Sequence, residues 1–530
     1  MKMTMQSYPK LLALAAALLA AGCTLAPKYE RPQAPVSASY PSGDVYRSDA
    51  QQGSGEVAPA DLGWRNFFSD ARLQALIEIA LRNNRDLRVA VLRVQEARAQ
   101  YRVQRADLLP ILSAEGTGTR SRTPADLSYT GRSTISSQYS VGPQASWELD
   151  FFGRIQSLNQ QALALFLAQA QARKATQLSL ISQVAQQYLA VRADDALLRV
   201  TDDTLRNARE SLRLAQVQFD TGTGTALDLS QAQGLVRQAE ANRAAQARAR
   251  AQALNSLVEL IGEPLPDDLP PPEEFEAQQI GEVPAGLPSD LLLRRPDILE
   301  AEQNLIAANA NIGAARAAFF PQISLTGNFG TASARLGGLF KAGSAAWSFA
   351  PSISLPIFSG GANLANLDLA HVEKNIYVAQ YEKAIQTAFR EVADGLAARG
   401  TYEDQIRSLQ DYVRSQQQRL QLSQLRYNSG VDSYLNVLTA QTDLYSAQQT
   451  LINAQLGHFD NLVTLYQNLG GGWLENTGDT PKPADAEPDY ADVDRNGTPR
   501  KQPAPAVTPR AQSSAAAQPA ALAPRTVPQD

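Results

Sequence analysis

The sequence predicts an α+β membrane protein made of two similar halves, each with a pair of strands and a long helical hairpin. Three observations support this prediction. The same motifs occur twice, stretches of more than a hundred residues lack proline, and short runs alternate polar and apolar side chains. The 530-residue chain has a formal charge of −5. This charge gives no reason to expect a nucleic-acid partner.

The internal duplication is visible in two sets of matching residues. Placing Asp86 on Asp297 aligns Pro110 with Pro321 at the same offset of 211 residues. Further along, FDTGTGTALDLSQAQ (219–233) matches YNSGVDSYLNVLTAQ (427–441) at an offset of 208 residues. Matches in the same order at nearly the same spacing indicate a duplicated unit.

Long helices are predicted because residues 144–263 and 357–480 contain no proline. A proline inside a helix costs roughly 3 kcal/mol. From Arg154 to Thr221 the chain also lacks glycine, and a continuous helix of this length would extend about 100 Å. A bilayer core is only about 30 Å thick, so this polar helix is expected to stand in water.

A seven-residue repeat in the last helical segment predicts that helices pair along a seam. The repeat comprises two series, Leu438, Tyr445, Ile452, Phe459 and Tyr466, and Leu435, Thr442, Gln449, Leu456 and Val463. Gly430 and its counterpart Gly222 lie between helical segments and are expected to mark the bends of two antiparallel hairpins.

Short runs with a period of two predict the strands. The clear runs are 139–149, 323–329 and 347–357, and a weaker run follows Pro110. The pattern also fits a half-buried soluble hairpin, but the export signal and the lack of other elements to cover these faces favour membrane strands. Four strands cannot close a barrel, because the smallest barrels use about eight, so the chain is expected to associate. The residues expected to face the water-filled interior are Gln144, Glu148, Ser324, Asn328 and Ser352.

The first 22 residues have the pattern of an export signal. Lys2 and Lys10 precede a short apolar run that ends in Ala20-Ala21-Gly22-Cys23, and this run is too short to remain as a membrane span. The ending resembles a lipobox, which implies a covalent lipid on Cys23. A simple signal peptide with an incidental cysteine is the alternative. No other cofactor is expected.

Several segments resemble the TolC-like outer-membrane factors, specifically the OprM-like lipoproteins. They are LLLRRPDILEAEQNL (291–305), AARAAFFPQISL (314–325), RYNSGVDSYLNVLTAQ (426–441) and LGGGW (469–473). The resemblance implies a homotrimer in the outer membrane, with a twelve-stranded transmembrane β-barrel (four strands per chain) continued by a long periplasmic α-helical barrel. It also implies a passive channel for drugs or other small molecules. The implied partners are a periplasmic adaptor, an inner-membrane transporter of the RND type and outer-membrane lipid.

The resemblance also assigns roles to single residues. The turns that dock the adaptor would be Gly222, Thr223, Gly224, Gly430, Val431 and Asp432. Asp228 stands where the family has a carboxylate at the periplasmic gate, whereas Asn436 and Thr439 replace aspartates and reduce the negative charge there. Asp228 could instead cap a helix, and the glycines could serve turn geometry alone.

No catalytic residue or metal site is predicted, because the two histidines, His371 and His458, have no ligand or nucleophile pattern around them. The alternative functions are a periplasmic adaptor lipoprotein and a structural coiled-coil lipoprotein of the envelope. The expected division is a signal peptide (1–22), a lipidated tether without a packed core (23–60), a first repeat (61–262), a proline-rich equatorial segment (263–289), a second repeat (290–474) and a disordered tail (475–530).

Overall fold

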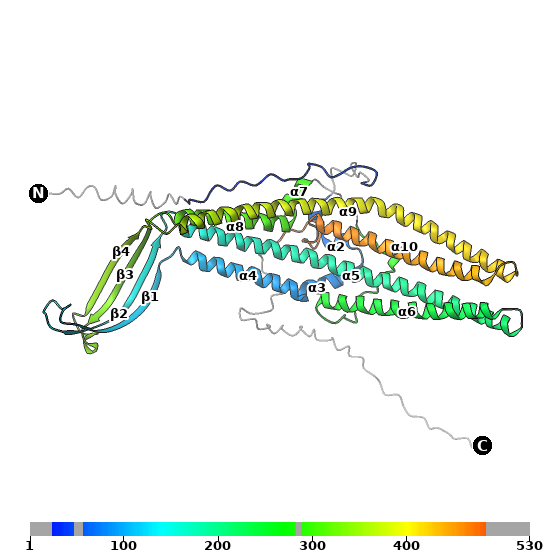
Figure 1. Cartoon of the computed structure of the whole chain (residues 1–530), viewed down its shortest axis with the longest axis horizontal. Coiled ribbons are helices and arrows are strands. Elements are labelled where there is room, and N and C mark those ends of the chain that lie inside the picture. The colour runs from blue at the N-terminus through cyan, green and yellow to red at the C-terminus, as the bar shows by residue number, and fades with distance from the viewer. Residues whose placement is uncertain (1–23, 47–56, 282–287, 484–530) are drawn as a thin grey trace, which may run out of the picture. The chain divides into compact units, whose positions relative to one another are not determined.

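The computed structural model describes residues 24–46, 57–281 and 288–483 (Figure 1). Cys23 and residues 484–530 lie outside the described residues, and so do the predictions made for them. Within the described ranges, no helix combines the length and apolarity needed to cross a membrane.

The same series of elements occurs in both halves of the chain. The pairs are α3 (Ala71–Asn83) with α7 (Pro288–Arg294), α4 (Arg85–Ala106) with α8 (Pro296–Ala317), β1 (Ile111–Thr123) with β3 (Gln322–Ser333), β2 (Thr134–Leu149) with β4 (Ala345–Ser354), α5 (Arg154–Asp220) with α9 (Ala362–Asn428), and α6 (Ala226–Ile261) with α10 (Tyr434–Asn468). Helices α4 and α8 are offset by 211 residues, and α5 and α9 are offset by 208 residues. These are the two offsets found in the sequence.

The four strands form one antiparallel sheet in the order β1-β2-β3-β4. The strands differ from the predicted runs at their ends. Strand β2 has 16 residues and begins before the predicted run, whereas β4 ends at Ser354 and leaves Ile357 outside the sheet. Pro356 lacks the N–H that a continued ladder would need. Pro351 is accommodated within β4 because β4 is an edge strand.

The long helices lie side by side, and the sheet is at one end of them (Figure 1). Helix α5 packs between α4 and α8, and α8 packs against α9. Helix α6 folds back on α5, and α10 folds back on α9 while also contacting α5. The two hairpin turns therefore lie together at the end of the helices that is far from the sheet (Figure 1).

The buried seam of α10 changes along the helix. Ile452, Val463 and Tyr466 are buried as the seven-residue repeat predicts. Near the turn, however, Tyr434 is 3% exposed and Leu435 is 50% exposed, so the predicted position is wrong there by one residue. An α-helix drifts by about 20° per heptad relative to a strict 3.5-residue repeat, and this drift moves the contact line from one residue to its neighbour.

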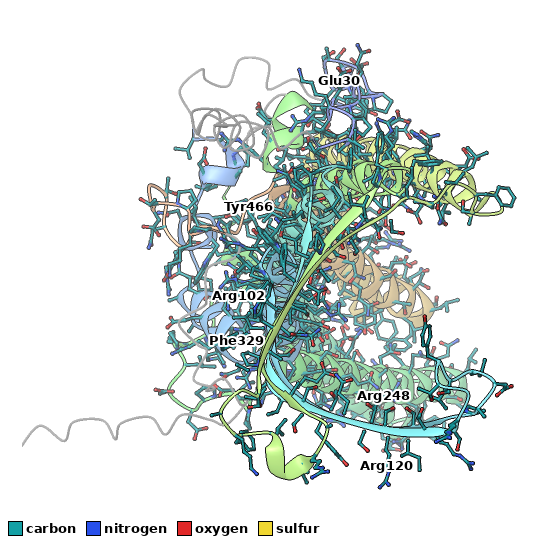
Figure 2. All side chains as sticks on the ribbon, turned by 90° about the vertical axis from the view of Figure 1, so that its left-hand side faces the viewer. Glu30, Arg102, Arg120, Arg248, Phe329 and Tyr466 are labelled. Carbon is teal, nitrogen blue, oxygen red and sulfur yellow. The ribbon has the colours of Figure 1, made fainter. Side chains whose placement is uncertain are left out.

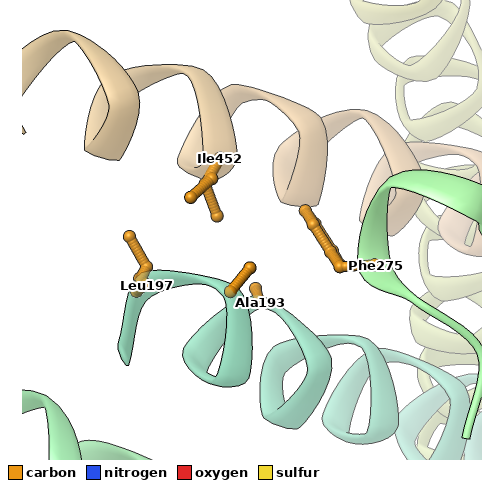
Figure 3. Packing of buried hydrophobic residues seen from close by; sticks show 5 residues of the cluster. Ala193, Leu197, Phe275 and Ile452 are labelled. Atoms are coloured by element: carbon orange, nitrogen blue, oxygen red, sulfur yellow. The ribbon is translucent and has the colours of Figure 1, made fainter. Parts of the chain in front are cut away.

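A buried cluster joins the halves about midway along the helices (Figure 3). Ala193 and Leu197 of α5 and Ile452 of α10 meet Phe275 of the short helix η2 (Phe275–Ala277). Phe275 is fully buried and its ring contacts that of Phe459 edge-on, with 5.6 Å between centroids. The segment between the halves is therefore packed onto both hairpins.

Residues 24–46, which we call the N-terminal strap, are held more firmly than their composition predicts. Arg31 donates through Nε and Nη2 to the two carboxylate oxygens of Glu302 on α8, at 2.7 and 2.8 Å. The Tyr29 hydroxyl donates to the same carboxylate at 3.0 Å, and the Tyr40 ring stacks on that of Phe389. The sequence predicts a tether without a packed core for this segment. The structure adds polar contacts from Tyr29 and Arg31 to the Glu302 carboxylate, which attach the strap to α8.

The residues that follow α10 also pack against the body of the protein. The backbone N–H groups of Trp64 and Arg65, in the short helix α2 (Trp64–Phe67), donate to the carbonyls of Leu474 and Glu475 at 3.0 and 3.1 Å. Arg65 also forms an ion pair with the Glu475 side chain at 2.8 Å. Glu475, the first residue of the predicted disordered tail, is therefore in contact with α2.

Candidate channel lining, gate and docking tips

The five predicted interior-facing residues share one face of the sheet. Gln144 is paired with Asn328, and Glu148 is paired with Ser324, which is paired in turn with Ser352. Directly paired residues in an antiparallel sheet point to the same side. The structure therefore brings all five together, as the period-two pattern requires.

Hydroxyl groups cover much of the remainder of this face. Cross-strand hydrogen bonds join Thr117 to Ser140 at 2.6 Å and Ser324 to Ser352 at 2.7 Å. A hollow of about 410 Å³ lies on the sheet here, and its lining includes Glu115. The opposite face carries Trp147, Leu325, Phe329, Trp347, Phe349 and Ile353. One side of the sheet is thus suited to water and the other to hydrocarbon.

Two glycines keep the middle strands in close contact on the polar face. A Cβ on Gly142 would lie 2.3 Å from the carbonyl oxygen of Phe329, and one on Gly330 would lie 2.2 Å from that of Val141. Both distances are far below van der Waals contact. Any other residue at either position would push β2 and β3 apart.

The passage from sheet to helix is fixed by side chains at the start of α5. Arg154 donates to both carboxylate oxygens of Glu148, at 3.0 and 2.8 Å. The Asp150 carboxylate accepts a hydrogen bond from the backbone N–H of Gln156 at 2.7 Å. Glu148 therefore has a structural partner in addition to its place on the polar face.

The predicted docking residues form two exposed turns with the same design. Gly222 and Gly430 adopt φ angles of 77° and 72°, which other residues rarely adopt. In the first turn, the N–H groups of Thr223 and Gly224 donate to the carbonyl of Gln218 at 2.9 and 2.8 Å. The predicted bends are confirmed at both glycines.

The second turn carries a charge pair and an exposed apolar side chain. Asp432 forms an ion pair with Arg426, and the hydrogen bond from Arg426 is the main reason why the pKa of Asp432 is lowered. The Val431 N–H donates to the Arg426 carbonyl at 2.9 Å, while the Val431 side chain is 63% exposed. The second turn therefore presents an apolar side chain next to a charge pair.

Asp228 has the geometry of a helix cap. The Thr225 hydroxyl oxygen accepts a hydrogen bond from the Asp228 N–H at 3.1 Å, and the Asp228 carboxylate accepts one from the Thr225 backbone N–H at 3.4 Å, so the two residues form a capping box. The same carboxylate also accepts a hydrogen bond from the Thr225 hydroxyl at 2.7 Å. Thr439 donates to the carbonyl of Leu435 within its own helix at 2.9 Å, and Asn436 is exposed on α10. The contacts of Asp228 and Thr439 are thus local to their own helices.

Contacts between the two hairpins near the turns come from residues that were not among the predicted gate residues. The Tyr427 hydroxyl on α9 donates to Oε1 of Gln218 on α5 at 2.5 Å. Gln441 on α10 donates to the Ser211 hydroxyl on α5 at 3.3 Å. Burial is the main cause of the raised pKa of Tyr427, and the nearby Asp228 carboxylate adds to it. The presence of tyrosine and glutamine within apolar seams was the available signal for these contacts.

The RRPD motif has a structural explanation that its sequence alone did not give. Arg295 is 7% exposed and donates to Asp297, to Glu391 on α9 and to the carbonyl of Asn468 at the end of α10. It therefore ties the start of α8 to both helices of the second hairpin.

The histidines do not form part of a recognisable chemical site. Burial lowers the pKa of His458, and its ring lies edge-on to that of Tyr402 at 6.0 Å. Across the described ranges, no group of three or more histidine, cysteine, aspartate or glutamate residues is placed to hold a metal ion.

A sheet with one polar and one apolar face, joined to long paired helices, defines a TolC-like channel protein. The sequence model of the family described as "Outer membrane efflux protein" matches residues 76–263 and 287–471, one segment in each half. The chain belongs to this family. The predicted outer-membrane location and role in efflux are therefore confirmed, and the adaptor and coiled-coil alternatives are set aside.

Similar proteins align with this chain over nearly their whole length. The probable efflux pump outer membrane protein TtgC of Pseudomonas putida is 50% identical over 472 residues, which cover 89% of this chain and 97% of the relative. The outer membrane protein OprJ of Pseudomonas aeruginosa is 44% identical, with coverages of 87% and 96%. The solved open state of the Neisseria gonorrhoeae MtrE outer membrane channel superposes with a TM-score of 0.77 at 40% identity, covering 86% of this chain and all of that one.

Proposed function

We propose that three copies of this chain assemble into a duct whose wall is a twelve-stranded barrel in the outer membrane and a helical barrel in the periplasm. The chain is the outer-membrane channel of a tripartite efflux pump. In our proposal the duct passively conducts drugs or other small molecules from an inner-membrane transporter of the RND type, through a periplasmic adaptor, to the exterior. The observation that supports this proposal best is the two-faced sheet with two open edges.

The open edges make association necessary in a membrane. Strands β1 and β4 each have a neighbour on one side only within the four-stranded sheet. Unpaired backbone groups in hydrocarbon cost several kcal/mol each. Pairing β4 of one copy with β1 of the next satisfies both edges, and β1 and β4 run in the opposite directions that an antiparallel pair needs.

The two outermost helices of the series also expose apolar side chains. Helix α4 exposes Val89, Leu92 and Val103, and the first turns of α9 expose Leu369, Val372 and Ile376. These two helices are at opposite ends of the series α4-α5-α8-α9. A head-to-tail contact between them repeats from copy to copy and closes into a ring.

Three copies fit a duct better than two. Two copies would supply eight strands, and a barrel of eight strands has an interior that side chains largely fill. Twelve strands leave room for a passage lined by the polar face. The residues we assign to this lining are Gln144, Glu148, Ser324, Asn328 and Ser352.

We further propose that the mature chain starts at a lipidated Cys23. The strap supports this assignment, because the Thr24 hydroxyl lies 3.1 Å from that of Ser157, near the start of α5 and close to the sheet. A lipid on the preceding residue would therefore be at the height of the membrane. The segments 23–60, 61–262, 263–289, 290–474 and 475–530 remain our proposed division of the mature chain.

At the far end, we assign adaptor docking to the two turns and the gate to the residues that follow them. The docking residues are Gly222, Thr223, Gly224, Gly430, Val431 and Asp432. The residues that we assign to the gate are Asp228, Asn436 and Thr439, which follow these turns. The capping box of Asp228 is compatible with this role, because one carboxylate oxygen can accept the Thr225 hydroxyl while the charge still faces the passage.

The assembly is tested by gel migration and by export. Expressed in an efflux-deficient bacterium with a cognate adaptor and transporter, the chain should migrate as an SDS-resistant trimer that dissociates on heating, and it should restore drug resistance. Monomer alone in several gentle detergents would refute the trimeric barrel. Labelled palmitate should be incorporated into the wild-type chain but not into the Cys23→Ser variant. Equal labelling of the two would refute lipidation at Cys23.

A further inference from the structure

The apolar face of the sheet carries two charged side chains at one end of β1. On β1 this face carries Leu112, Ala114, Gly116 and Gly118, and then Arg120 and Arg122. The register places these residues on the same side as Trp147 and Phe329 of the neighbouring strands. Among the residues of the four strands, these two arginines are the charged side chains of the apolar face. Figure 2 shows Arg120 and Phe329 on the outer side of the curved sheet.

The surroundings of these arginines are strongly positive. The loops at this end of the sheet, 124–133 and 334–344, add Arg132, Arg335 and Lys341, and Asp126 is their single carboxylate. The whole chain, by contrast, has a net charge of −5. Arg120 and Arg122 are exposed, and neither forms an ion pair or side-chain hydrogen bond within the described parts of the chain. Their charges are therefore open to an external anion.

The position of the pair along the strand matches the border of a membrane. Ten residues separate Leu112 from Arg122, which is about 33 Å of strand at 3.3 Å per residue. With the tilt of about 40° usual in barrels, this length spans about 25 Å, the height of the apolar band of outer-membrane barrels. Because the helices leave from the Leu112 end, the arginines lie at the exterior border. This step rests on the proposed function.

We propose that Arg120 and Arg122 bind the phosphate groups of the glycolipid in the outer leaflet of the outer membrane. Arginine is suited to this role, since its planar guanidinium donates two parallel hydrogen bonds to a phosphate. A β-strand spaces alternate side chains by about 7 Å, so two guanidinium groups on one face can hold two phosphates or two oxygens of a bulky headgroup. The neighbouring apolar side chains then contact the acyl chains of the same lipid.

The experiment measures the affinity of the purified full-length chain in detergent for diphosphorylated lipid A. The variant R120Q/R122Q should bind about tenfold more weakly, because it loses two charge-assisted contacts. The matched control R248Q removes an exposed arginine on α6, a helix that lies away from the sheet (Figure 1), and should bind like the wild type. Fully dephosphorylated lipid A should bind the wild type and R120Q/R122Q equally.

Two outcomes would overturn the inference. One is unchanged lipid A affinity in R120Q/R122Q. The other is equal competition by phosphatidylglycerol, which would mean that the surface binds any lipid phosphate. The variant R120K/R122K, which keeps the charge but not the planar fork, should retain intermediate affinity and so shows that a loss in the glutamine variant is not misfolding. Trimer formation and export by the wild type test the proposed function separately.

Discussion

The strap provides a contact whose strength can be worked out from the structure. Arg31 supplies two of the three hydrogen bonds that the Glu302 carboxylate accepts from the strap. The Glu302 side chain is 6% exposed and that of Arg31 is 43% exposed. Removing one partner of a buried ion pair costs about 3–5 kcal/mol, whereas an exposed pair contributes about 0–1 kcal/mol. Since one partner is buried and the other is not, we expect Arg31→Gln to weaken strap attachment by about 1–2 kcal/mol.

Hydrogen exchange of the full chain, followed by mass spectrometry, reads this change directly. A loss of about 1.4 kcal/mol corresponds to a tenfold change in the opening equilibrium, so amides in the strap should exchange about tenfold faster while those of α8 are unchanged. Lys28→Gln removes an exposed cation of the same strap and should leave exchange as it is. Equal rates in the two variants would refute the assignment. The double variant R31Q/E302Q should lose less than the sum of the single variants, because no buried charge is left without its partner.

Three further predictions concern the helical region. Asp70→Ala removes the cap of α3 and leaves the buried Tyr188 hydroxyl without its acceptor, so unfolding in detergent should require about 2–4 kcal/mol less; an unchanged melting temperature would contradict this. Gly430→Val forces a β-branched residue into a left-handed turn and should abolish export while trimers persist, whereas loss of trimers would indicate a folding role. Burial raises the pKa of Asp460 to about 6. Ionisation of Asp460 therefore destabilises the folded chain increasingly as the pH rises from about 4 through 6. Asp460→Asn should stabilise the fold by about 1 kcal/mol at pH 7.5 but not at pH 4. A gain in stability that does not depend on pH would contradict this cause.

Features that depend on local chemistry could be predicted from the sequence. Helix α5 extends from Arg154 to Asp220 because no proline or glycine interrupts it. The shared face of Gln144 and Glu148 follows from a period of two within one strand, whereas the place of Asn328 beside them depends on the register of β2 and β3. Both turns could be predicted, because a glycine between two helical segments supplies the positive φ angle that such a turn needs.

Contacts between distant segments could not be predicted in the same way. Tyr427 and Gln218 are 209 residues apart in sequence, and nothing in either local pattern points to the other. The ion pair of Arg31 with Glu302 joins residues 271 apart, and the glutamate lies within a helix whose sequence does not reveal that its carboxylate is buried. A capping role for Asp228 could be predicted as an alternative because it follows a glycine bend, and its partner Thr225 is only three residues away.

The equal lengths of α5 and α9, 67 residues each, have a consequence for how such a protein can change over evolution. Deleting one heptad from each helix of a single hairpin would shorten it by about 10 Å at 1.5 Å per residue. The two turns would then lie at different distances from the sheet, and a partner could no longer contact both at the same level. Insertions and deletions are therefore tolerated only when both halves change together. A duplicated gene thus carries a constraint that either half alone would not have, and engineered changes of duct length must be introduced in pairs.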